Sequence, residues 1–119
     1  MENLHLAVVE TRFADIIWQH APLSSGELVK LCAEELSWKK STTYTVLKKL
    51  CDRGLFQNVD GVVSVCISKT EYEAIRSEQF VDDTFKGSLP AFFAAFTARK
   101  NLSDAEIAEI RAIIDRYGK

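Results

Sequence analysis

Apolar residues follow a helical period through the first third of the chain. They predict three helices, over residues 6–20, 24–36 and 40–53. In the first helix the apolar stripe consists of Leu6, Val9, Phe13, Ile16 and Ile17. Pro22 ends this helix and Gly54 ends the third, while a capping box that starts at Ser24 opens the second.

The pattern changes to β-favouring residues after Gly54. Two such runs, over 55–59 and 62–67, flank the pair Asp60 and Gly61. An Asp-Gly pair in this position is the strongest short signal for a β-hairpin with a two-residue turn.

Helical spacing returns for the rest of the chain. A capping box at Ser68 opens a helix that stops at Gly87, and a short apolar helix follows over 89–98. A third capping box, at Ser103, opens the last helix. The predicted fold class is therefore mainly α with a small β-hairpin.

Three helices followed by a hairpin, in about 65 residues, is the layout of a winged helix-turn-helix, whose third helix lies in the DNA major groove. We therefore expect a winged-helix DNA-binding domain over 1–67 and a helical dimerisation region over 68–119. The buried stripe of the third helix is expected to be Thr43, Val46, Leu47 and Leu50. Its other side carries hydroxyl groups and lysines, with Tyr44 at the boundary.

The charge distribution favours the same assignment. The whole chain has a net charge of −2, but residues 37–53 contain five basic residues and a single acidic residue. A basic segment of this kind can bind a polyanion even in an acidic protein. Lysines are common on any solvated helix, so charge alone also fits an ordinary surface helix.

Several blocks of the sequence are similar to a known family. The segment 10–18 and the block Trp38-x-x-Ser-Thr-x-x-Thr-x-Leu-x-x-Leu50, followed by Arg53-Gly54, resemble the BlaI/MecI penicillinase repressors. The similarity continues through 80–89 to 102–107, and so covers nearly the whole chain.

This resemblance implies a dimeric transcriptional repressor of a bacterium that binds palindromic operator DNA, often that of β-lactam-response genes. It places Ser41, Thr42, Tyr44, Thr45 and Lys48 toward the groove, and Lys39, Lys40 and Lys49 on phosphates. A dimer would read two half-sites about one or two helical turns apart.

The predicted wing departs from the family. Family wings carry basic and aromatic residues, whereas residues 58–65 contain no basic residue. Each missing phosphate contact flattens the salt dependence of DNA binding by about one unit. An alternative function is therefore a dimeric winged-helix protein-interaction module that has lost DNA binding.

The second half of the chain is too short and too apolar to be a solvated domain of its own. Burial of one large apolar side chain is worth about 1.5–3 kcal/mol, and a two-fold dimer can bury several. The residues expected at this dimer interface are Phe80, Phe85, Leu89, Phe92, Phe93, Phe96, Ile107, Ile110 and Ile114. The alternatives are packing on the chain's own winged helix and a pocket for an apolar ligand.

The resemblance also implies a regulator. Repressors of this type are inactivated when a protease under the control of a membrane sensor cuts an Asn-Phe bond in the first dimerisation helix. The matching bond here is Gln79–Phe80, with glutamine in place of asparagine. Without the resemblance, Gln79 is an ordinary surface residue of a helix.

Other chemistry is not expected. The cysteines, Cys32, Cys51 and Cys66, are widely spaced in apolar surroundings, which favours reduced, buried side chains over disulfides or a metal site. The sequence shows no nucleophile–base arrangement and no glycine-rich phosphate loop, so neither an enzyme nor a cofactor is expected. Without a signal peptide or a run of about 18 apolar residues, we expect a cytoplasmic protein that does not insert into membranes.

Overall fold

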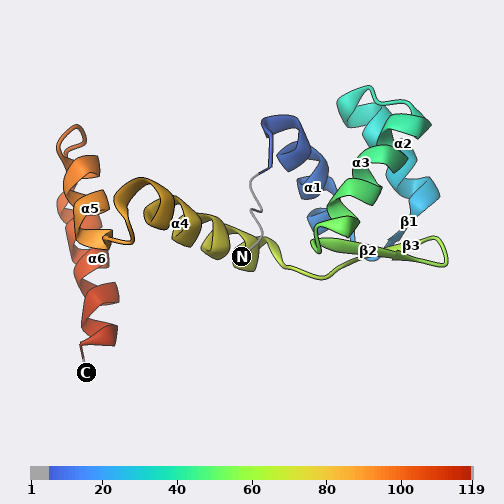
Figure 1. Ribbon diagram of the computed structural model, residues 1–119. Helices are drawn as coiled ribbons and strands as arrows, with labels where there is room; N and C mark the ends of the chain where they lie inside the picture. Colours follow the sequence, from blue (N-terminus) through green and yellow to red (C-terminus); the bar gives the residue numbers. More distant parts are fainter. Residues whose placement is uncertain (1–5, 119) are drawn as a thin grey trace. The chain divides into compact units, whose positions relative to one another are not determined.

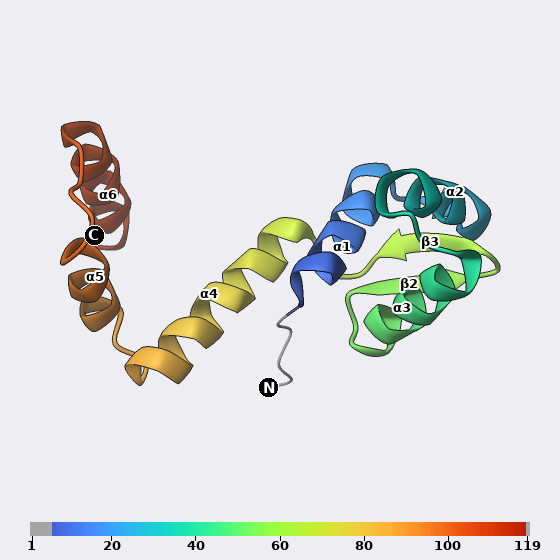
Figure 2. The same cartoon turned by 90° about the horizontal axis from the view of Figure 1, so that it is seen from above.

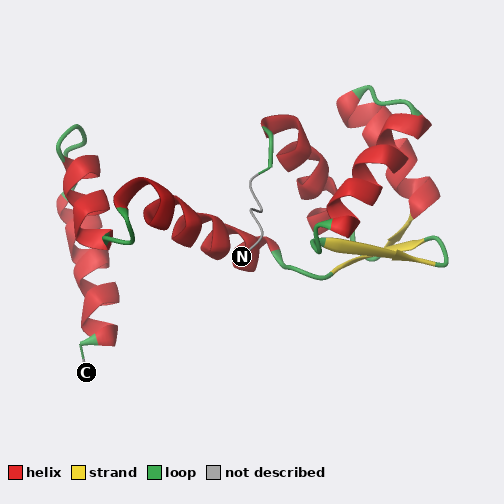
Figure 3. Ribbon diagram, viewed as in Figure 1, coloured by secondary structure: helices red, strands yellow, loops and turns green. Residues whose placement is uncertain are grey.

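A computed structural model describes residues 6–118, and in that range it contains six helices and three strands (Figures 1 and 3). The chain divides into two compact units, Met1–Gln79 and Phe80–Lys119. The division lies inside helix α4 (Lys69–Phe85), so that one helix contributes to both units. The domain boundary predicted from the sequence, after residue 67, precedes this helix.

The helices of the first unit lie within a few residues of their predicted positions, on one face of a small sheet (Figure 1). They are α1 (Val8–His20), α2 (Ser25–Leu36) and α3 (Lys40–Asp52). Ser24 caps α2 as expected, because its Oγ accepts the backbone N–H of Glu27 at 3.0 Å. Between α2 and α3, Trp38 stacks on Phe13 with ring centroids 5.3 Å apart, which fixes the turn of the helix-turn-helix.

The predicted hairpin forms (Figure 2) and is part of a three-stranded antiparallel sheet. Strands β2 (Phe56–Val59) and β3 (Val62–Val65) pair directly, with Val59 opposite Val62. The φ angles of Asp60 and Gly61 are 51° and 77°, as a type I′ turn requires. The two-residue strand β1 (Leu23–Ser24), which the sequence analysis did not predict, pairs with the other side of β3.

A single core joins the helices of the first unit to the sheet. Its buried apolar residues are Leu6, Phe13, Ala14, Ile16, Ile17, Leu23, Leu28, Cys32, Leu47, Leu50, Leu55, Phe56, Val63 and Tyr72. Trp18 connects this core to the end of the hairpin, since its Nε1 donates to the carbonyl of Ile67 at 3.0 Å. Because Tyr72 contacts the Trp18 ring, the first turns of α4 belong to this unit.

One position of the predicted apolar stripe of α1 was wrong. Val9 is 44% exposed, whereas its neighbour Glu10 is only 9% exposed. The Glu10 carboxylate accepts the backbone N–H of Ala7 at 3.0 Å and so satisfies a free amide at the start of α1. A polar residue at this position is buried because it has partners.

The second unit contains the end of α4, α5 (Leu89–Thr97) and α6 (Asp104–Tyr117). Gly87, with φ of +81°, terminates α4 as predicted. The capping box of α6 is complete: Ser103 Oγ accepts the Glu106 N–H, and the Glu106 carboxylate accepts the Ser103 N–H. None of the described residues of this unit is buried, although several are large and apolar.

Candidate nucleic-acid interface

Helix α3 has the two faces that its sequence predicts, except that Val46, expected in the buried stripe, is only half-buried. Thr43, Leu47 and Leu50 are buried in the core of the first unit. The opposite side, which is exposed to solvent, carries Ser41, Thr42, Thr45 and Lys48. Hydroxyl groups and lysines are the groups that bind base edges and phosphates, so this side has the chemistry of a DNA-reading surface.

The amino-terminal end of α3 has a local excess of positive charge. Lys39, the residue before the helix, and Lys40, its first residue, are both exposed. The side chain of Lys39, at the N-cap position, makes no capping hydrogen bond within the described residues. The positive end of the helix dipole and two lysines therefore face the solvent together, which favours an anion such as a phosphate.

The two lysines in the last turns of α3 have different surroundings. Lys48 lies on the exposed side, where its Nζ is 3.0 Å from the carboxylate of Asp52. Lys49 faces α1 instead, with its Nζ 2.7 Å from the carboxylate of Glu10. The hydrogen bond from Lys49 is the main reason why the pKa of Glu10 lies below its ordinary value. Lys49 thus holds α3 against α1 and is the less accessible of the two lysines.

Tyr44 is half-buried at the edge of α3, as expected. Its hydroxyl donates to Ser25 Oγ at 3.0 Å, at the start of α2. The backbone N–H of Ser25 in turn donates to the carbonyl of Gly61 in the hairpin turn, at 2.8 Å. Ser25 therefore connects the third helix to the tip of the wing.

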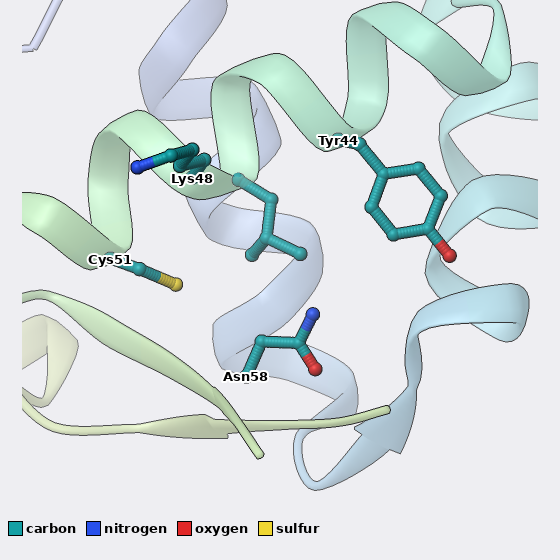
Figure 4. A pocket seen from close by; sticks show the side chains of 5 residues that line it. Tyr44, Lys48, Cys51 and Asn58 are labelled. Carbon is teal, nitrogen blue, oxygen red and sulfur yellow. The ribbon is translucent and has the colours of Figure 1, made fainter. Parts of the chain in front are cut away.

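A groove separates α3 from the wing strand β2 (Figure 4). It has a volume of about 400 Å³ and is lined by Tyr44, Leu47, Lys48, Cys51 and Asn58. Asn58 is the lining residue that comes from the wing, and its side-chain amide points toward α3 in Figure 4. We refer to this depression as the α3–wing groove.

The wing itself has little charge. Asp60 is the charged residue of the segment 54–67, and the φ values place it in the turn. Val59 and Val62, which face each other across the two strands, are about half exposed. The wing therefore presents apolar and neutral polar groups.

The second unit exposes two apolar surfaces. The first is an aromatic cluster in which the rings of Phe80, Phe85, Phe92 and Phe96 are about 6 Å apart. The second is a groove of about 410 Å³ between α5 and α6, lined by Leu89, Pro90, Phe93, Ile110, Ile113 and Ile114. Ile107, half-buried, lines a smaller cavity beside it together with Phe93 and Ile114. Of the nine residues predicted for the dimer interface, eight lie on these two surfaces, and the ninth, Ile107, lies in the adjoining cavity.

The sequence matches the profile described as "Penicillinase repressor" over residues 6–116. The chain belongs to the penicillinase repressor family. It is 26% identical to the penicillinase repressor of Bacillus licheniformis over 112 residues, covering 91% of this chain and 88% of that protein.

A second relative is the methicillin resistance regulatory protein MecI of Staphylococcus aureus strain Mu50. It is 24% identical over 119 residues, covering 97% of each chain. Among solved structures, the multiple antibiotic-resistance repressor MarR of Listeria monocytogenes has a TM-score of 0.47 at 15% identity, covering 95% of this chain and 73% of that chain. Membership of the penicillinase repressor family, together with the fold, supports a winged-helix transcriptional repressor.

The bond matched to the cleavage site of the family lies inside a helix. Gln79 and Phe80 are consecutive residues of α4, at the division between the two units. Proteases bind substrates in extended form, so cleavage at this bond requires α4 to open locally. Cleavage of this family member at Gln79–Phe80 stays a prediction.

The cysteines of this family member are all free, but they differ in exposure. Cys32 is buried, Cys51 is half-buried and Cys66 is exposed, so the expectation of burial was wrong for Cys66. Cys66 follows the last residue of β3, where the sheet ends.

Across residues 6–118, no cluster of three or more potential metal ligands forms. In the same range, no helix is long and apolar enough to cross a membrane.

Three residues that hold or line the interface were not predicted from the sequence: Glu10 behind α3, Ser25 and Asn58. Glu10 had no capping signature in the sequence, because the residue three positions before it is Ala7, whose side chain cannot accept a hydrogen bond. The strand alternation could have placed Asn58 on the same side of the wing as the buried Val63. Ser25 had no signal, because its partners Tyr44 and Gly61 are distant in sequence.

Proposed function

We propose that this chain is a homodimeric repressor that binds palindromic operator DNA through α3. The observation that carries the proposal is the exposed side of α3, with three hydroxyl residues and unburied lysines, in a winged helix of this family. The relatives are named for penicillinase and methicillin resistance, which supports genes of the β-lactam response, or related genes, as targets.

The proposed contacts divide by chemistry. Ser41, Thr42 and Thr45 reach base edges, while Lys39, Lys40 and Lys48 neutralise phosphates. Thr45 Oγ1 donates to the carbonyl of Ser41 at 2.9 Å, so it would act toward DNA as an acceptor. We assign Tyr44 to the border of this surface, and Lys49 to holding α3 in place through Glu10.

The homodimer is supported by the second unit, in which none of the described residues is buried. Phe80 and Phe96 are each about half exposed, and Leu89 and Ile114 are each more than 60% exposed. Leaving such side chains in water forgoes about 1.5–3 kcal/mol each. A two-fold dimer that covers the aromatic cluster and the α5–α6 groove with the same surfaces of a second copy would bury them.

The experiment is a mobility-shift titration with the DNA upstream of the chain's own gene, at two salt concentrations and with scrambled competitor DNA. The wild type should give a specific shift that weakens steeply with salt. Thr45→Ala combined with Lys48→Ala should abolish the specific shift while the protein stays dimeric. The control is Ser77→Ala combined with Lys100→Ala, which removes a hydroxyl and a lysine outside α3 and should bind like the wild type.

The neutral wing favours a second candidate, the dimeric protein-interaction module without DNA binding. This candidate predicts no shift at micromolar wild-type protein and low salt, from a protein that is folded and dimeric. If the double variant of α3 becomes monomeric instead, the two proposed surfaces have been assigned the wrong way round.

A further inference from the structure

The segment 54–67, which forms the wing, contains no basic residue. Any contribution of the wing to DNA binding therefore has to come from neutral groups. Its two neutral amides, Gln57 and Asn58, lie on opposite faces of the hairpin. Gln57 pairs with Ser64 and donates to its Oγ at 3.0 Å. Asn58 pairs with the buried Val63 and lines the α3–wing groove. Its side-chain amide is exposed and points toward α3 (Figure 4).

We infer that the α3–wing groove holds the sugar–phosphate backbone of one DNA strand, with the Asn58 amide donating to a phosphate oxygen. This inference rests on the proposed function, because it extends the DNA surface of α3 to the wing. It assigns to Asn58 a contact with DNA, and to the groove a ligand.

The lining of the groove suits a DNA backbone. Leu47 and Cys51 give it an apolar floor, against which a deoxyribose ring can pack. Lys48 and Asn58 come from opposite walls, α3 and β2, and supply a cation and a neutral N–H donor (Figure 4). Asparagine is one of the residues that commonly bind backbone phosphates.

The charges that line the α3–wing groove favour an anion over a cation. The groove has no carboxylate among its lining residues, and Lys48 is its cation. The carboxylate closest to that cation, Asp52, is one helical turn further along α3 and is itself exposed. A phosphate that approaches Lys48 can displace this surface ion pair, which contributes no more than about 1 kcal/mol.

The α3–wing groove is continuous with the exposed side of α3, and this favours a DNA strand over a small free anion as its occupant. Four of the five lining residues belong to α3, and Lys48 is shared between the groove and the exposed side of that helix. A strand whose bases meet the exposed side of α3 would therefore continue into the groove. A small anion would need no such connection.

The test compares variants of the two neighbouring amides on the DNA fragment that the wild type shifts. Asn58→Ala should raise the dissociation constant about tenfold and leave the slope of binding against salt unchanged, because the lost contact is uncharged. Asn58→Asp should weaken binding more strongly, since its carboxylate would face a phosphate. Gln57→Ala is the matched control, and it should bind like the wild type.

Asn58→Lys should change the affinity for DNA in the opposite direction. A cation in the groove should tighten binding at low salt and steepen the salt slope by about one unit per protomer. Thermal unfolding of each variant shows that the fold is intact, as the exposed position of residue 58 predicts.

The outcomes separate this inference from the function on which it rests. If the wild type shifts no DNA, the proposed function fails. If the wild type binds specifically but Asn58→Asp and Asn58→Lys both bind with its affinity and slope, the groove holds no DNA phosphate and the inference is overturned. A titration of the wild type with inorganic phosphate, followed by NMR at the groove residues, then tests whether a small free anion is the occupant instead.

Discussion

Single residues of the first unit have roles that their type alone does not indicate. Glu10 is the clearest example, because one carboxylate caps α1 and holds Lys49 of α3. A buried carboxylate is stable only with such partners. The position of the third helix therefore depends on an acidic residue that lies outside the proposed interface.

Replacing Glu10 should destabilise the first unit in a pH-dependent way. Glu10→Gln should lower the free energy of unfolding by about 1–2 kcal/mol at pH 7. A hydrogen bond to a charged group contributes about 1.5–3 kcal/mol, and the exposure of the Lys49 side chain reduces this value. Because the pKa of Glu10 is lowered from 4.5 in the folded state, its contribution is complete above that ordinary value. It is lost as the pH falls through the lower, folded-state pKa.

Urea unfolding of wild type and variant at pH 7 and at pH 3 measures this difference, which should shrink at the acidic pH. The control is Asp52→Asn, which removes an exposed ion pair with Lys48 and should change the stability by less than about 1 kcal/mol. Equal losses at both pH values would show that the charge of Glu10 does not matter.

The three thiols should differ in reactivity in the order of their exposure. Burial raises the pKa of Cys32 to about 11, and it also raises the pKa of Cys51. Alkylation at pH 8 should therefore modify Cys66 first, Cys51 more slowly and Cys32 only on unfolding, since the thiolate is the reactive form. Peptide mapping after timed alkylation measures the order, and a fast Cys32 would contradict the packing of α2.

At the scale of elements, the sequence predicts what local chemistry determines. Gly54, Gly87 and the serine caps fix helix ends through backbone conformation and nearby amides, so their positions can be read from the sequence. The faces of α3 follow from the helical period. Strand β1 and the contact of Tyr44 with Ser25 depend on segments far apart in the chain, for which no local pattern exists.

The same limit applies to the candidate interface. The exposed residues of α3 could be predicted because they share one helix, whereas the groove required β2 to be placed against that helix. Asn58 was overlooked for this reason: its neighbours in the groove lie between seven and fourteen positions earlier in the chain.

The hairpin turn offers a prediction about the wing as an element. Asp60→Asn should keep the type I′ turn, because asparagine accepts positive φ readily, and it removes the negative charge of the segment 54–67. DNA binding should tighten about twofold to threefold at low salt and less at high salt, because salt screens this charge. Mobility shifts at two salt concentrations measure it, and Glu73→Gln, a charge change on exposed α4, is the control. Equal effects of both variants on DNA binding would mean that the position of this charge on the wing does not matter.

At the scale of the whole molecule, the second unit determines the assembly. Phe93→Asp places a charge in the α5–α6 groove and should weaken dimerisation more than about hundredfold, because an unpaired buried carboxylate is very unfavourable. Sedimentation velocity over a dilution series measures the change. Asn101→Asp, which adds the same charge at an exposed position in the loop after α5, should remain dimeric. A Phe93→Asp protein that stays dimeric would place the interface elsewhere.

Residues 80–118 of the second unit include no buried residue, and this has a consequence for how the protein responds to its own abundance. On the proposed dimer, ordering these forty residues and finding a partner are one equilibrium, so stability itself depends on concentration. In the dilute limit, halving the total protein lowers the paired form about fourfold by mass action. A modest change in synthesis or degradation would then be amplified into a larger change in operator occupancy, before any inducer acts.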